Sequence, residues 1–112
     1  MKRILWLLTG GTFSCVPSDS GLAPDSSDTQ AREILLCMPY LTEKYDIVPK
    51  VLMNIDSTDM TPERLRTIAE TADGSVGSYD GIVITHGTDS MAYTAAALSV
   101  MLSCVPVPIV LT

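Results

Sequence analysis

The stretch "ILWLLTGGT", residues 4–12, decides the fold because its apolar run stops abruptly at two glycines. Five consecutive apolar residues bounded by glycine are typical of a strand that is buried on both faces of a parallel sheet. Gly10 and Gly11 allow another group to approach the backbone closely, and Thr9 and Thr12 stand on either side of them. The turn fits a plain strand-to-helix connection, a phosphate-binding loop or a nucleophile held at a strand end. The phosphate hypothesis is the weakest, because neither GxxxxGK[ST] nor GxGxxG occurs.

The rest of the chain alternates strand and helix patterns. We expect further buried strands at residues 47–55, 81–85 and 107–112. We expect helices from Asp28 or Thr29 to about Met38, from Pro62 to the break "DGSVGS" at 73–78, and from Ser90 to Ser103. Residues 9–27 are polar and read as a long loop, and Pro39 marks the end of the first helix. This β-α-β-α-β-α-β order predicts a three-layer α/β fold of the Rossmann or flavodoxin-like type, with a mostly parallel sheet and helices on both faces.

Composition narrows the class of protein. The chain has 112 residues, 46% of them apolar, and a net charge of -6, which indicates one folded domain. Its seven basic residues are scattered, so we expect no nucleic-acid partner. We also expect no secretion signal, because the apolar run before the glycines is too short. Pro106 and Pro108 interrupt the charge-free stretch 90–112, which we therefore interpret as a helix and strand buried on several sides rather than a membrane span.

The cysteines indicate a reduced, cytoplasmic setting. There are three of them, with no CxxC pair, and a single histidine leaves no zinc-finger spacing. Cys15 lies in the polar loop, whereas Cys37 and Cys104 stand among apolar neighbours and are predicted to be small core residues.

Three polar turns follow the first three predicted strands, at residues 9–14, 56–60 and 85–90. Because the carboxyl ends of parallel strands share one edge, we expect these turns to gather on one rim, where such sheets bind ligands. In the third turn, Asp89 fits three roles: binding an amine, orienting a base, or capping the next helix. We interpret His86 as structural, because GxSxG is absent. Asp56 and Asp59 do not match calcium-loop spacing.

Taken together, three motifs carry a specific resemblance. "TGGTFS", "DSTDMTPE" and "THGTDSMAYTA" stand in order after the first, second and third predicted strands. In this combination they resemble the bacterial-type L-asparaginase family, most closely its cytosolic branch. The resemblance spans the whole chain. It implies hydrolysis of L-asparagine, with L-glutamine left open as a substrate, by a homo-oligomer that needs neither metal nor organic cofactor.

The resemblance also implies a role for individual residues. Thr12 matches the family's nucleophile, and Thr88 matches its second catalytic threonine. Ser57 matches the residue that holds the substrate α-carboxylate, and Thr58 takes the next substrate-lining place. Asp89 matches the residue that binds the α-amino group and belongs to a Thr-Lys-Asp network. The two glycines would then clear space for the amide beside Thr12, and Thr9 would support the turn.

The match also has gaps, which leave alternatives open. The family's catalytic lysine and its smaller C-terminal domain have no counterpart in these residues, so we expect residues 1–112 to be an incomplete N-terminal domain, inactive alone. Leu22 stands where many members carry a loop tyrosine. One alternative is the ammonia-producing subunit of a tRNA-dependent amidotransferase, which the position of Met1 directly before the first strand disfavours. The other is a binding module without turnover.

Overall fold

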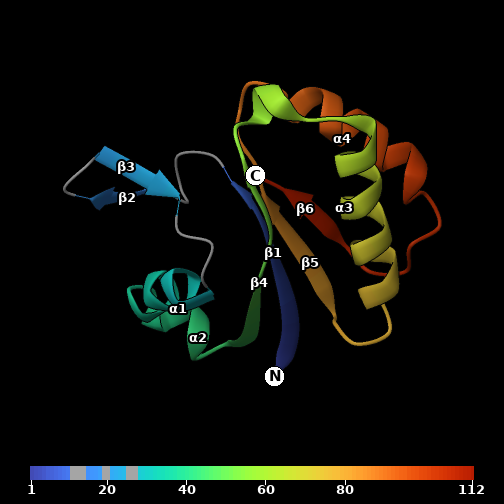
Figure 1. The fold of residues 1–112 in the computed structure, drawn as a ribbon. Helices are drawn as coiled ribbons and strands as arrows, with labels where there is room; N and C mark the ends of the chain where they lie inside the picture. Colours follow the sequence, from blue (N-terminus) through green and yellow to red (C-terminus); the bar gives the residue numbers. More distant parts are fainter. Residues whose placement is uncertain (11–14, 19–20, 25–27) are drawn as a thin grey trace.

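The computed structural model of the chain describes residues 1–10, 15–18, 21–24 and 28–112 (Figure 1). The strands are β1 (Lys2–Gly10), β2 (Cys15–Ser18), β3 (Gly21–Pro24), β4 (Tyr45–Ile55), β5 (Gly81–Thr85) and β6 (Ile109–Leu111). The helices are α1 (Asp28–Leu36), α2 (Pro39–Thr42), α3 (Pro62–Ser75) and α4 (Met91–Met101), and a 3-10 turn, η2, lies at Ser57–Asp59.

Four of the strands form one parallel sheet in the order β4-β1-β5-β6, which confirms the predicted α/β fold. The first strand therefore lies in the interior of the sheet. The chain moves to one side of β1 to make β4 and to the other side to make β5 and β6. The order of strands reverses between β1 and β5, and this switch point is where sheets of this kind leave a crevice for ligands at the carboxyl ends of the strands.

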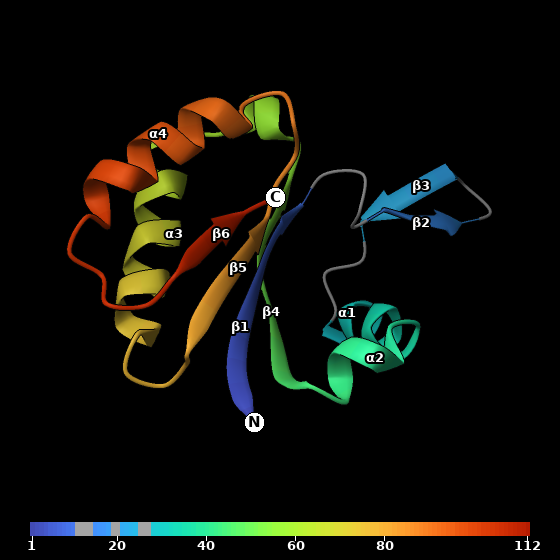
Figure 2. The same ribbon diagram turned by 180° about the vertical axis from the view of Figure 1, so that it is seen from behind.

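Helices cover both faces of the sheet. Successive side chains of β1 point to opposite faces, so its apolar run needs a covering element on each face. Leu5 and Leu7 point to the face that α3 and α4 cover, where they are buried with Ile68 and Leu98. Trp6 and Leu8 point to the opposite face, where they pack with Ala31 of α1. Figure 2 shows α1 on one side of the sheet and the α3–α4 pair on the other. The unbroken apolar run at 4–8 is thus explained by burial on two sides.

Three local expectations were wrong in part. Residues predicted to lie in one long loop include an antiparallel hairpin, with Cys15 paired to Pro24 and Ser18 to Gly21. Pro39 does more than end a helix: it begins α2, where its missing N–H leaves no hydrogen bond unmade. Helix α3 runs through Asp73 and Gly74 to Ser75 instead of stopping before them, with the Ser75 hydroxyl bonded to the Thr71 carbonyl.

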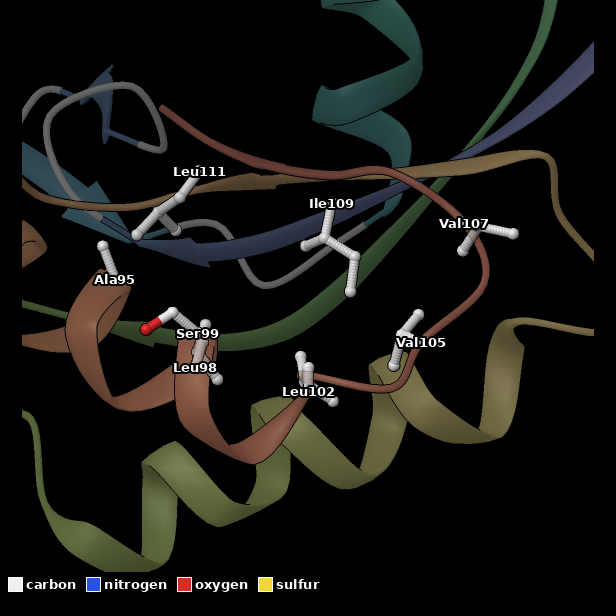
Figure 3. Close-up of a pocket in the computed structure, with 8 residues that line it drawn as sticks. All are labelled: Ala95, Leu98, Ser99, Leu102, Val105, Val107, Ile109 and Leu111. Atoms are coloured by element: carbon white, nitrogen blue, oxygen red, sulfur yellow. The ribbon is translucent and has the colours of Figure 1, made fainter.

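The charge-free stretch 90–112 is less buried than predicted. On α4, Tyr93 is 79% exposed and Val100 is 77% exposed, and Val110 in β6 is 53% exposed. An apolar groove of about 450 Å³ lies between α4, the segment that follows it and β6. Figure 3 shows the side chains that line it. Its lining residues are Ala95, Leu98, Ser99, Leu102, Val105, Val107, Ile109 and Leu111. No helix in the described part of the chain is long and apolar enough to cross a membrane.

The two cysteines predicted to be buried are exposed. Cys37 follows the last residue of α1, and Cys104 lies in the turn after α4; both are free thiols. Each stands where its helix has just ended, so apolar neighbours in the sequence do not become neighbours in space. The side chain of Cys15 lies outside the described residues.

Candidate active site

The first and third turns meet at the carboxyl ends of β1 and β5. Thr9 is buried, and its hydroxyl donates to the Thr85 carbonyl over 2.8 Å. Three residues earlier on β1, the Trp6 indole N–H donates to the Thr85 hydroxyl over 3.1 Å. These bonds fix the end of β1 to the end of β5, which confirms that Thr9 supports the turn.

Gly10 brings the first turn against the end of β4. Its φ of +119° lies in a region that other residues avoid, and any Cβ there would collide with the backbone of Ile55. The resemblance implies that the two glycines clear space for a substrate amide, but at Gly10 the backbone of β4 occupies that space. Gly11 and the nucleophile candidate Thr12 lie outside the described residues.

The second turn is closed by its own polar groups. One carboxylate oxygen of Asp56 accepts from both the backbone N–H and the hydroxyl of Thr58, each over 3.0 Å. These two hydrogen bonds stabilise the carboxylate and lower the pKa of Asp56 from its ordinary value. The Asp59 and Met60 amides donate back to the Asp56 and Ser57 carbonyls, completing the 3-10 turn. The carboxylate of Asp56 therefore holds the backbone of this turn.

The second and third turns touch at Ser57. Ser57 is 4% exposed, and a Cβ built on Gly87 would lie only 2.9 Å from its Cβ and Oγ. The Ser90 hydroxyl donates to the Ser57 carbonyl over 2.6 Å. The second and third turns, with Thr9 and Gly10 of the first, are therefore brought together at one rim, as the sequence predicts.

The imidazole of His86 is fully engaged in structural bonds. The ring is buried, with Nδ1 2.5 Å from the Gly87 carbonyl and Nε2 3.0 Å from the Thr94 hydroxyl. Since a carbonyl only accepts, Nδ1 donates to Gly87, and Nε2 is hydrogen-bonded to the Thr94 hydroxyl. These two bonds tie the third turn to α4, which confirms the structural interpretation of His86.

Three of the predicted site residues carry a side-chain polar group without a hydrogen-bond partner. Within the described part of the chain, the hydroxyls of Ser57 and Thr88 and the carboxylate of Asp89 have no hydrogen-bond partner. Thr88 and Asp89 are exposed, so a ligand can reach them. The cap hypothesis for Asp89 is wrong, because Ser90 holds the N-cap position of α4. Thr58 differs from the others, since its hydroxyl is already bonded to Asp56.

Ser90 is the residue that the sequence reasoning missed. The sequence predicts it only as the first residue of a helix, because nothing local distinguishes a serine that caps its helix from one that bonds elsewhere. Among the described residues, no group of three or more His, Cys, Asp or Glu side chains is placed to hold a metal ion.

Comparison with known proteins gives consistent matches over almost the whole chain. The profile described as asparaginase, N-terminal, matches residues 3–112. L-asparaginase 1 of Escherichia coli K12 is 40% identical over 99% of this chain and 33% of its own length. A glutamyl-tRNA(Gln) amidotransferase subunit of Thermococcus kodakarensis is 48% identical over 99% of this chain and 25% of its own.

The fold comparison agrees. The solved structure of the thermostable L-asparaginase from Thermococcus kodakarensis superposes with a TM-score of 0.80 at 38% identity, covering 97% of this chain and 33% of that one. The chain thus spans about a third of the length of the asparaginases that it matches and a quarter of the amidotransferase subunit.

Proposed function

The chain belongs to the asparaginase family, and on that premise we propose that it is the N-terminal part of an amidohydrolase that converts L-asparagine to L-aspartate and ammonia. One observation carries the proposal. The unpartnered Ser57 and Thr88 hydroxyls and the Asp89 carboxylate lie on one rim, beside the switch point between β1 and β5. L-glutamine has the same three functional groups and remains a second candidate substrate.

The chemistry of the substrate matches these groups. L-asparagine carries one ammonium, one carboxylate and one amide. The Asp89 carboxylate would bind the ammonium, and the Ser57 hydroxyl would donate to the carboxylate, with Thr58 lining the site beside it. Holding both ends of the substrate presents its amide to Thr12 and replaces a bimolecular attack by an effectively unimolecular one.

The proposed reaction has two steps. The Thr12 hydroxyl oxygen bonds to the amide carbon, its proton passes to the amide nitrogen through a base, and the C–N bond breaks to release ammonia. Water then adds to the resulting ester, the Thr12 oxygen recovers a proton, and L-aspartate leaves. Backbone N–H groups near Thr12 and Thr88 would stabilise the oxyanion, at about 3–4 kcal/mol for each good donor. Thr88 is the second catalytic threonine in this scheme.

We further propose that the base is a lysine outside these 112 residues, which with Thr88 and Asp89 would form a Thr-Lys-Asp network. Lys44 and Lys50 precede the third turn and do not take that place. The one-third coverage of the asparaginases and the bare apolar side of α4 support a longer, homo-oligomeric enzyme with a further domain. The free, exposed thiols of Cys37 and Cys104 support a reducing, cytoplasmic location.

The test is ammonia release from L-asparagine by the polypeptide that the natural gene encodes. Thr12→Ala should lower kcat by about a thousandfold or more, because the covalent route is lost. Thr67→Ala is the matched control, since it removes a threonine hydroxyl from the solvent side of α3 and should leave the rate unchanged. An unchanged rate in Thr12→Ala would refute the nucleophile assignment, and no ammonia from the wild type would refute the activity.

The 48% identity to an amidotransferase subunit supports a second candidate, an ammonia-producing subunit of a tRNA-dependent amidotransferase. The same assay separates the two. Ammonia release by the isolated protein supports the asparaginase. Release that requires a partner protein and charged tRNA supports the amidotransferase. Binding of L-aspartate without turnover in either assay would support a binding module.

A further inference from the structure

Ser90 stands at a helix N-cap position, but its side chain does not cap the helix. It is the N-cap residue of α4, where a serine hydroxyl ordinarily accepts a hydrogen bond from an N–H of the first helical turn. No such cap bond is present for α4. The hydroxyl instead donates to the Ser57 carbonyl over 2.6 Å, across 33 residues of sequence.

The bond adds a second donor to a carbonyl that the second turn already holds through the Met60 amide. Asp56 and Thr58 close the turn from its exposed side. The Ser57 carbonyl accepts from the Met60 amide over 3.2 Å, a longer bond than the one from Ser90. On its other side, Ser57 lies against Gly87, where there is no room for a Cβ. Ser57 is thus fixed from the third turn as well as from its own.

We propose that Ser90 is a positioning residue that sets the orientation of Ser57, so that the free Ser57 hydroxyl faces the carboxylate of a bound amino acid. The inference rests on the proposed function. Ser90 touches no substrate in this scheme; it acts only through the Ser57 peptide. The missing cap of α4 lies at the rim that carries the proposed substrate-binding groups. Departures from a local preference such as N-capping are expected at functional sites.

The role predicts a particular kinetic signature. Losing the Ser90 hydroxyl leaves the Ser57 carbonyl with only the longer bond from the Met60 amide. Ser57 is then held less firmly, which weakens a contact made equally in the ground state and the transition state. KM should then rise while kcat stays nearly constant. A merely structural role would instead lower the fraction of folded enzyme, and hence the apparent kcat, without changing KM.

The experiment measures kcat and KM for L-asparagine in the polypeptide that the natural gene encodes, comparing Ser90→Ala, Ser90→Gly and Ser90→Thr. We expect Ser90→Ala to raise KM about three- to tenfold, the range for loss of one hydrogen bond. Ser90→Gly should match it, because glycine is tolerated at an N-cap. Ser90→Thr keeps the donor and should restore the wild-type KM.

Ser99→Ala is the matched control. It removes a serine hydroxyl from the same helix, where that hydroxyl bonds only the Ala96 carbonyl, and KM should not change. An active wild type whose KM is unaltered by Ser90→Ala and Ser90→Gly would overturn the inference. A loss of kcat at constant KM would also overturn it. A wild type without activity would instead refute the proposed function, so the two failures are distinguishable.

Discussion

Helices α3 and α4 lie side by side on one face of the sheet and contribute to the same core, yet they differ on the side that faces solvent (Figure 1). The outer side of α3 is polar, and Arg66 and Glu70 form an ion pair there over 3.1 Å. The outer side of α4 exposes Tyr93, Val100 and Met101, and the helix carries no charged residue. An apolar pattern all round a helix is typical of one that is covered on every side.

The starts of the two helices differ as well. Thr61 caps α3, accepting from the Arg64 amide over 3.3 Å, and Pro62 follows at the first helical position. Ser90 leaves α4 uncapped and bonds to Ser57. Helix α3 is thus complete within the described structure. Helix α4 differs at both places: the residue at its start bonds to the second turn, and its outer side exposes apolar side chains.

The largest expected effect is on the free energy of unfolding, and it compares the buried side of α3 with the exposed side of α4. Ile68 of α3 is fully buried, and Ile68→Ala should lower the free energy of unfolding by about 2–5 kcal/mol through lost burial and the cavity left behind. Val100→Ala is the counterpart on the exposed side of α4 and should change it by less than about 0.5 kcal/mol. Urea denaturation of both variants measures this. A comparable loss in Val100→Ala would mean that α4 is covered.

A smaller effect concerns the two helix starts. Thr61→Ala should cost about 1 kcal/mol and speed amide exchange at Arg64, because the lost cap belongs to α3 itself. Ser90→Ala should leave amide exchange in the first turn of α4 unchanged and instead alter the amides of the Ser57–Met60 turn. Hydrogen exchange read by NMR distinguishes the two patterns. Faster exchange at the start of α4 in Ser90→Ala would show that Ser90 caps its own helix after all.

The same contrast explains what the sequence could and could not predict. Strand β1 and its turn were predictable, because an apolar run that stops at glycine, as at Leu8 to Gly10, is typical of a buried strand. The rim followed from the polar turns after the first three strands, because the carboxyl ends of parallel strands share one edge. The hairpin at 15–24 was missed because its strands are short and carry prolines, without an apolar alternation.

Exposure and bond direction depend on tertiary partners, and here the sequence misled. The apolar neighbours of Cys37 and Cys104 suggested burial, but burial requires a covering element, which neither has in the described structure. The letters of "GTDS" likewise do not reveal whether Ser90 bonds to its own helix or to another turn. The free groups of Ser57, Thr88 and Asp89 were found because family motifs, and not local propensity, pointed to them.

The smallest expected effect on the free energy of unfolding comes from a substitution on the outer side of α4, which tests whether that surface drives self-association. Val100→Lys places a charge on that surface, and because Val100 is 77% exposed, the free energy of unfolding should change by less than about 0.5 kcal/mol. The change should nevertheless reduce self-association of the 112-residue chain in light scattering, since the substitution interrupts the exposed apolar surface. Thr67→Lys, at an already polar position on α3, is the control and should alter neither quantity. Equal scattering from Val100→Lys and the wild type would mean that this surface does not drive association, and the apolar side of α4 would then differ from the polar side of α3 in composition alone.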